Sequence, residues 1–201
     1  MANLITLSRL LMLVAVILAL YAGPGPQLVA FFVLIALFLT DTLDGYVARR
    51  RGEESLFGAV FDIAADRIVE LSLWIVFAHL GAIPVWIPLV FVARGTLTDA
   101  IRAVQTSATG TAPFAAVRSP LARFLVAGKF MRTGYAVIKA VTFCTLTLSL
   151  PAATLLPESW QMLAVVLAQL GLALAILSVV LCLARGLPVI VEFALAEAKR
   201  P

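Results

Sequence analysis

Apolar residues dominate the chain in runs long enough to cross a lipid bilayer as helices. A hydrocarbon core about 30 Å thick needs about 20 helical residues. Glycine and proline interrupt these runs at residues 23–26, 81–84 and 151–157, so they divide the apolar sequence into separate helices. The pattern predicts six membrane helices, at residues 4–22, 27–50, 57–80, 84–104, 124–150 and 159–184.

The expected fold class is an all-α integral membrane protein with a single domain, residues 1–201. Hydrophobic residues make up 63% of the chain, charged residues 13%, and the mean hydropathy is +1.08. Such a composition argues against a water-soluble domain. Residues 188–201 begin with Pro188 and mix apolar with basic positions, which suits either a short helix at the membrane surface or a frayed end.

Basic residues gather in every second connection between the predicted helices. They follow the second, fourth and sixth helices: Arg49, Arg50, Arg51, Arg102, Arg118, Arg123, Arg185, Lys199 and Arg200. The connections at 23–26, 79–84 and 151–158 contain no Lys or Arg. The positive-inside rule therefore predicts that both termini and the basic connections face the cytoplasm, with the bacterial inner membrane as the expected location. The net charge of +4 fits this topology and anionic headgroups, and no nucleic-acid partner is expected.

Carboxylates are concentrated where the second predicted helix ends and the third begins. The chain has 15 Lys and Arg and 11 Asp and Glu residues, and 11 of these 26 lie between residues 41 and 70. Asp41 and Asp44 are three residues apart, and Asp62 and Asp66 are four apart, so each pair shares a helix face. Because a carboxylate in hydrocarbon is costly, this cluster predicts a functional site near the cytoplasmic surface.

Two interpretations of the four carboxylates are open. Arg49 and Arg67 are near enough in sequence to neutralise two of them as ordinary ion pairs. Alternatively, divalent cations bind all four, and an all-oxygen ligand set favours hard ions such as Mg²⁺, Mn²⁺ or Ca²⁺. Two such ions at about 3.5–4 Å would suit phosphoryl transfer.

The spacing of the cluster resembles a known family signature. Its fixed positions are Asp41, Asp44, Gly45, Ala48, Arg49, Gly58, Asp62 and Asp66. This arrangement resembles the signature of the CDP-alcohol phosphatidyltransferases, and the length and predicted helix count are also similar. The resemblance implies an enzyme of phospholipid biosynthesis that transfers a phosphatidyl group from CDP-diacylglycerol to an alcohol, releases CMP, and works as a homodimer among membrane lipids.

The resemblance also implies a role for each motif position. Asp41, Asp44 and Asp62 would bind two divalent cations, with Asp66 touching the metal site and acting as the general base. Such a carboxylate can take a proton from a hydroxyl whose pKa a metal lowers. The CDP-diacylglycerol site would comprise Gly45, Ala48 and Gly58 beside the cytidine, with Arg49 on the pyrophosphate.

A second set of polar residues bears on the acceptor. Arg94, Thr98 and Arg102 recur every four residues on the fourth predicted helix. With Gly128-Lys129, Arg132-Thr133 and the opening Asn3-Leu4-Ile5-Thr6 and Arg9, they resemble the phosphatidylglycerophosphate synthase branch. The resemblance implies that the acceptor is a phosphorylated alcohol, first of all sn-glycerol 3-phosphate. Its phosphate would bind Arg94, Arg102, Lys129 and Arg132.

Other functions remain open at this point. Inositol phosphate or another phosphorylated alcohol would suit the same basic residues. The arginine stripe can also be read as side chains reaching lipid headgroups. A transporter or ion carrier could likewise place aspartates in a membrane helix, although it would typically show two matching halves.

Overall fold

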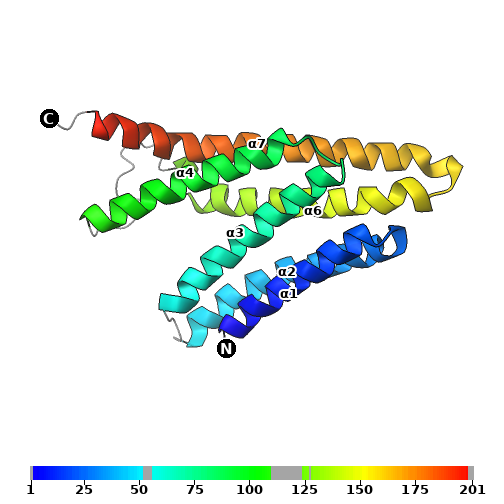
Figure 1. Cartoon of the computed structure of the whole chain (residues 1–201), viewed down its shortest axis with the longest axis horizontal. Helices are drawn as coiled ribbons and strands as arrows, with labels where there is room; N and C mark the ends of the chain where they lie inside the picture. Colours follow the sequence, from blue (N-terminus) through cyan, green and yellow to red (C-terminus); the bar gives the residue numbers. More distant parts are fainter. Residues whose placement is uncertain (1, 52–55, 110–123, 127, 199–201) are drawn as a thin grey trace. The chain divides into compact units, whose positions relative to one another are not determined.

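Helices make up nearly all of the structure. In a computed structural model of the chain, the described residues are 2–51, 56–109, 124–126 and 128–198, and these contain no strand (Figure 1). Within these ranges, side chains are described except at residues 2–5, 41–51, 56–57, 59, 105–109, 129 and 196–197. The long helices of the described residues are α1 (Ala2–Tyr21), α2 (Pro24–Arg51), α3 (Leu56–His79), α4 (Trp86–Thr109), α6 (Lys129–Leu155) and α7 (Gln161–Glu197). A short 3₁₀ helix, η1 (Glu158–Trp160), precedes α7.

The turn between α1 and α2 follows from its glycine and proline residues. Gly23 has a φ of 103°, a conformation that side chains with a Cβ rarely adopt. Pro24 then occupies the first position of α2, where a missing N–H costs nothing. The Gln27 side chain donates a hydrogen bond to the Leu20 carbonyl at 3.0 Å, which joins the end of α1 to the beginning of α2. The predicted break between the first two helices is confirmed, but it comprises only residues 22–23, because α2 already begins at Pro24.

Two predicted helix ends are wrong, because the helices continue through proline. Helix α6 contains Pro151 and ends at Leu155, and α7 contains Pro188 and continues to Glu197 without a separate surface helix. Proline removes one backbone donor. Near Pro151, the hydroxyls of Ser149 and Thr154 donate to backbone carbonyls of the same helix. Hydroxyl donors of this kind help membrane helices to tolerate proline.

The chain forms two compact units, which are described separately. Unit 1 comprises Met1–Pro84 and Ala140–Ala173, and unit 2 comprises Val85–Lys139 and Leu174–Pro201. Helices α6 and α7 each contribute one part to either unit. A single domain over the whole chain stays a prediction.

Unit 1 is built on an aromatic cluster. In this unit α1 packs against both α2 and α3. The ring of Phe143 lies 4.5 Å from that of Trp74, 6.0 Å from that of Phe77 and 6.2 Å from that of Phe38, measured between centroids. Trp74 and Phe77 are fully buried. Because large rings bury the most apolar area per residue, this cluster holds α3 against the part of α6 in the same unit.

Unit 2 has a smaller apolar core. Ile101 of α4, Val126 and Val189 of α7 are buried together, and Ile190 and Phe193 pack against them. The residues around Pro188 thus belong to a packed helix. Their burial explains why α7 continues where the sequence suggested a separate segment.

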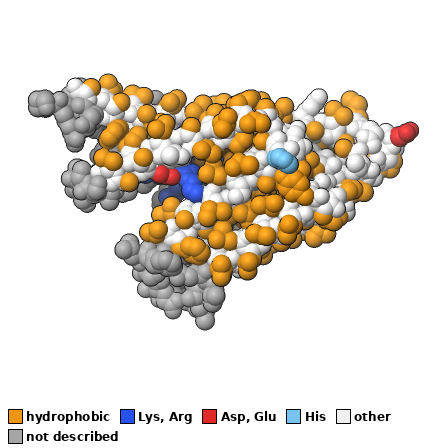
Figure 2. Space-filling model, viewed as in Figure 1, with side chains coloured by type: hydrophobic (Ala, Val, Ile, Leu, Met, Phe, Trp, Pro, Cys, Tyr) orange, Lys and Arg blue, Asp and Glu red, His pale blue; other side chains and the backbone are white. Residues whose placement is uncertain are grey.

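Large apolar side chains remain on the surface of both units. Six of the most exposed are Leu11, Leu18, Phe32, Ile63, Phe130 and Met162. Hydrophobic side chains cover most of the face shown in Figure 2. Two helical stretches of the described residues, Phe130–Leu155 and Glu158–Leu195, are long and apolar enough to cross a bilayer, while Thr6–Tyr21 and Pro24–Thr40 are shorter apolar helices. Six membrane crossings stay a prediction.

Candidate active site

The motif is divided between two helices of unit 1. Asp41, Asp44, Gly45, Ala48 and Arg49 all lie within the uninterrupted helix α2, although their side chains are outside the described part of the structure. On a helix, residues three apart lie on one face, so the backbone places Asp41 and Asp44 together as the spacing predicts.

The other motif positions lie on α3, where the side chains of both aspartates are described. Gly58, Asp62 and Asp66 occupy the first half of this helix. The carboxylates of Asp62 and Asp66 are about half exposed, at 51% and 53% of their side-chain area. They share one face of α3, in agreement with their four-residue spacing.

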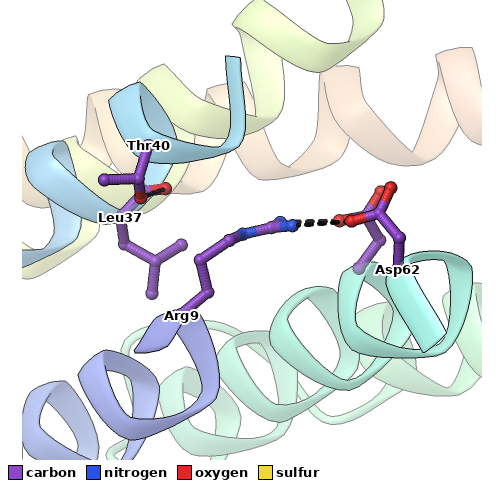
Figure 3. Close-up of polar contacts among 5 residues, drawn as sticks. Arg9, Leu37, Thr40 and Asp62 are labelled. Carbon is purple, nitrogen blue, oxygen red and sulfur yellow. Dashed lines mark hydrogen bonds and ion pairs between the residues drawn. The ribbon is translucent and has the colours of Figure 1, made fainter. Parts of the chain in front are cut away.

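One arginine from α1 joins the two carboxylates. Arg9 donates from Nη1 to Oδ1 of Asp62 at 3.2 Å and from Nη2 to Oδ1 of Asp66 at 2.6 Å. Figure 3 shows the guanidinium extending from α1 toward the carboxylates on α3. The Arg9 side chain is only 3% exposed. The two carboxylates therefore converge on a cation that is buried within unit 1.

This cation is not one of the two that the sequence suggested as partners. Arg67 lies 3.6 Å from Glu70 on its own helix. In the sequence, Arg9 stood out only as part of a family resemblance, although its position carries a further signal. Arg9 is the only Lys, Arg, Asp or Glu among the first 40 residues. A single charge inside such an apolar run needs a partner, and that need points to a functional or structural contact.

The carboxylate pair fits a site for hard divalent cations. Its donors are carboxylate oxygens, they lie on one helix face, and they retain access to the surface. Among the residues whose side chains are described, no group of three or more His, Cys, Asp or Glu residues converges. Two of the four proposed ligands, Asp41 and Asp44, lie outside that set. The described half of the site is thus compatible with metal binding, and the full ligand set stays a proposal.

Unit 2 contains a cluster of arginines around α7. Arg185 experiences the charges of Arg94, Arg102 and Arg132, so four cations lie within electrostatic reach of one another. The Arg185 guanidinium lies over the Tyr135 ring, with 5.4 Å from Cζ to the centroid, and Nη2 donates to the Val126 carbonyl at 3.3 Å. The ring and the carbonyl hold the Arg185 side chain in place.

Two members of the arginine cluster have buried nitrogen atoms without a hydrogen-bond acceptor. These atoms are Nε of Arg94 and both Nε and Nη1 of Arg185, as judged within the described residues. Gly186 makes room for Arg94, because a Cβ at residue 186 would lie 2.6 Å from Cγ and Nε of that side chain. Buried, unsatisfied guanidinium donors are costly, and an anion with several oxygens would satisfy them.

The residues predicted to hold the acceptor phosphate have different surroundings. Arg94 and Arg102 lie on α4, and Arg102 is 3.7 Å from Asp99. Arg132 is exposed on α6, whereas Lys129 begins that helix and its side chain is outside the described set. Thr98 of the predicted stripe is fully buried and donates to the carbonyls of Arg94 and Gly95.

Arg185 was missing from the predicted acceptor residues. Its signal in the sequence is its position, since it is the first charge after the uncharged run from residue 159 to residue 184. Sequence analysis assigned it only to topology. The structure instead places it among the arginines that the analysis had selected.

The helical fold, the exposed apolar side chains and the half-exposed carboxylate pair on α3 suit a membrane protein with a polar site. The chain matches the family model "CDP-alcohol phosphatidyltransferase" over residues 1–184. It therefore belongs to the CDP-alcohol phosphatidyltransferase family. The resemblance inferred from the eight motif positions is confirmed at this level.

Individual relatives point to phospholipid synthesis. The chain is 37% identical over 98 residues to a protein named "Probable phosphatidylglycerophosphate synthase" from Mycobacterium tuberculosis, and the match covers 47% of each chain. It is 36% identical over 74 residues to "Cardiolipin synthase (CMP-forming)" from Streptomyces coelicolor, covering 37% of this chain and 34% of the relative. The matched segment spans about half the length or less of these relatives.

Proposed function

We propose that this chain transfers a phosphatidyl group from CDP-diacylglycerol to the hydroxyl of a phosphorylated alcohol, with sn-glycerol 3-phosphate as the first candidate. The observation that carries the proposal is the convergence of Asp62 and Asp66 within the region that matches the family. The name of the mycobacterial relative supports the choice of acceptor. The bacterial inner membrane, a cytoplasmic site and a homodimer belong to the same proposal.

The chemistry requires a carboxylate that can accept a proton. The acceptor oxygen attacks the phosphorus that carries the lipid, the bond from that phosphorus to the CMP oxygen breaks, and CMP leaves. Asp66 takes the hydroxyl proton. Asp41, Asp44 and Asp62 would hold two divalent cations, Mg²⁺ or Mn²⁺, and Asp66 would border this metal site; such ions would neutralise phosphate charge and lower the pKa of the hydroxyl. Gly45, Ala48 and Gly58 border the cytidine, and Arg49 holds the pyrophosphate.

The arginine cluster of unit 2 is the proposed site for the acceptor phosphate. Arg94, Arg102, Lys129 and Arg132 belong to it, and we add Arg185 because its buried Nε and Nη1 have no acceptor among the described residues. A phosphomonoester carries up to two negative charges and three acceptor oxygens, so it would offset the repulsion among these cations. Serine and glycerol carry no net negative charge, so they would not offset this repulsion.

The relative from Streptomyces coelicolor suggests a second class of acceptor. A cardiolipin synthase is similar to a shorter part of this chain, which makes a lipid acceptor the alternative. Inositol phosphate remains a rival of the same chemical type as glycerol 3-phosphate. A carrier with an intramembrane aspartate cluster is the alternative from another class, and it would release no CMP.

An acceptor screen tests this proposal. Purified protein in lipid nanodiscs receives CDP-diacylglycerol and one of sn-glycerol 3-phosphate, inositol 1-phosphate, phosphatidylglycerol, glycerol or serine, and CMP release is measured. We expect the fastest release with glycerol 3-phosphate. The Asp66→Asn variant should lose at least about 10³-fold in kcat, a loss of roughly 4 kcal/mol, while still binding CDP-diacylglycerol. Equal rates with glycerol and glycerol 3-phosphate would contradict the proposed phosphate site. Absence of CMP release with every acceptor would contradict the proposed transferase activity.

Metal removal provides an independent test. The proposed ligands are all carboxylates, so chelation should abolish CMP release, and added Mg²⁺ or Mn²⁺ should restore it. Zn²⁺ should not be needed, because Cys and His are absent from the proposed ligand set. Full activity after exhaustive chelation would show that the aspartates have another role.

A further inference from the structure

Arg9 is a buried cation with an unusual position in unit 1. It lies on α1, whereas every member of the recognised motif lies on α2 or α3. The whole residue is 2% exposed, and no other Lys, Arg, Asp or Glu occurs in residues 1–40. Burying a charge among apolar helices costs several kcal/mol unless hydrogen bonds and opposite charges compensate it. Its location therefore depends on the carboxylates that it reaches.

The geometry of the contact suits arginine in particular. Nη1 and Nη2 donate to two different side chains, Asp62 and Asp66, one helical turn apart. A planar guanidinium holds two nitrogen donors in a fixed fork, so it can bridge acceptors on consecutive turns. A lysine ammonium has the same charge but presents it from a single atom, and so cannot reproduce the fork.

Both contacts use only one oxygen of each carboxylate. Arg9 bonds Oδ1 of Asp62 and Oδ1 of Asp66, and both carboxylates are still about half exposed. The guanidinium approaches from the buried side of α1. A carboxylate held in this way cannot rotate freely, and it keeps its second oxygen for another partner.

We propose that Arg9 is a positioning residue that orients the metal ligand Asp62 and the general base Asp66 as one unit. The inference rests on the proposed function and adds a residue that acts through these aspartates without touching the substrate. Helix α1 packs against both α2 and α3, so the backbone that carries Arg9 is held beside the helix that carries Asp62 and Asp66. Contacts of this kind behind metal ligands commonly change metal affinity by about 10–100-fold.

The test measures Mn²⁺ binding in the absence of substrate. Purified wild-type protein, Arg9→Gln and Arg9→Lys are titrated with Mn²⁺, and free Mn²⁺ is measured by electron paramagnetic resonance. We expect both variants to bind Mn²⁺ at least about 10-fold more weakly than wild type. We also expect kcat for CMP release to fall while the KM for CDP-diacylglycerol changes little, since the residue acts on ligand and base.

Gln27→Leu is the matched control on the same helical hairpin. Gln27 lies near the beginning of α2, and the substitution removes its side-chain hydrogen bond to Leu20, at the end of α1 away from Arg9. It should lower thermal stability without changing Mn²⁺ affinity. If Arg9→Gln does not fold, the Mn²⁺ affinity of Arg9→Lys tests the proposal, because this variant retains the buried positive charge.

Three results would overturn the role of Arg9. Unchanged Mn²⁺ affinity with reduced stability would make Arg9 structural. Tighter Mn²⁺ binding in Arg9→Gln would show that Arg9 competes with the metal for the carboxylates. Wild-type Mn²⁺ affinity in Arg9→Lys would show that a positive charge is enough and that the two-nitrogen geometry of arginine is not needed. Failure of the wild-type protein itself to bind Mn²⁺ would instead remove the metal site of the proposed function, and this role of Arg9 with it.

Discussion

At the scale of single residues, two arginines with buried guanidinium nitrogens, Arg9 and Arg185, organise the polar parts of the two units. Arg9 joins Asp62 and Asp66, and Arg185 lies among the arginines of unit 2. Arg9 lies inside a long apolar run and Arg185 directly follows one, where a charge is costly and an oppositely charged partner stabilises it. For Arg9 the partner is part of the protein, whereas for Arg185 we propose that it is the acceptor phosphate.

Replacement of Arg185 tests the phosphate site directly. Arg185→Gln should raise the KM for glycerol 3-phosphate by roughly 10–100-fold, because a hydrogen bond to a charged group contributes about 1.5–3 kcal/mol. Arg102→Ala and Lys129→Ala should act in the same direction, and CDP-diacylglycerol binding should change little. Steady-state kinetics with each substrate varied in turn measure these effects.

The contrasting variant for this prediction is Arg49→Ala. It should weaken CDP-diacylglycerol binding and leave the KM for the acceptor nearly unchanged, since Arg49 is proposed to hold the pyrophosphate. If Arg185→Gln and Arg49→Ala both altered only the CDP-diacylglycerol KM, the arginine cluster would belong to the donor.

At the scale of the helices, small residues decide how closely neighbouring backbones approach. Gly171 on α7 faces Leu146 on α6, and a Cβ at residue 171 would lie 2.7 Å from Cδ2 and 3.7 Å from Cα of that leucine. Leu146 is fully buried. The leucine has no space to move away, so the absence of a side chain at residue 171 allows α6 and α7 to pack within unit 1.

Gly171→Ala should therefore destabilise the protein. Overpacking a close contact costs about 1–3 kcal/mol, which should appear as a lower thermal unfolding temperature in detergent. Gly134→Ala on α6 is the control, because a Cβ there meets nothing within 4 Å. Alanine favours a helix over glycine by about 1 kcal/mol, so this control should keep or raise the unfolding temperature. Equal stability of the two variants would show that the contact with Leu146 is unimportant.

At the scale of the whole molecule, the distribution of charge predicts the orientation in the membrane. The last three residues of α2 are Arg49, Arg50 and Arg51, whereas residues 151–158 contain no Lys or Arg. Basic connections stay on the cytoplasmic side. The proposed active site lies next to these arginines in the sequence. This orientation would therefore place its soluble substrates and CMP in the cytoplasm.

Cysteine labelling tests this orientation. In a background with Cys144→Ala and Cys182→Ala, an added Glu158→Cys should react with a membrane-impermeant maleimide in intact spheroplasts. Ser55→Cys, between the second and third helices, should react only after the membrane is permeabilised. Labelling of Ser55→Cys in intact spheroplasts would reverse the orientation and place the aspartates outside.

By itself, the sequence determined the helical class, the family and the placement of the motif on neighbouring helices. Those features depend on local properties: apolar run lengths, the turn chemistry at Gly23, and the spacing of Asp62 and Asp66 along one helix. Local sequence also located the break between α1 and α2 to within three residues.

Only the tertiary structure decided which residues meet across helices. The contact of Arg9 with Asp62 and Asp66 joins positions more than 50 residues apart, and no local spacing encodes it. The continuation of α6 through Pro151 and of α7 through Pro188 likewise depends on the surroundings. Ala152 and Val189, next to the two prolines, are buried, so packing outweighs the intrinsic preference of proline to end a helix. The position of Arg185 in the arginine cluster has the same cause. The other arginines lie on α4 and α6, and only folding brings them near Arg185 on α7.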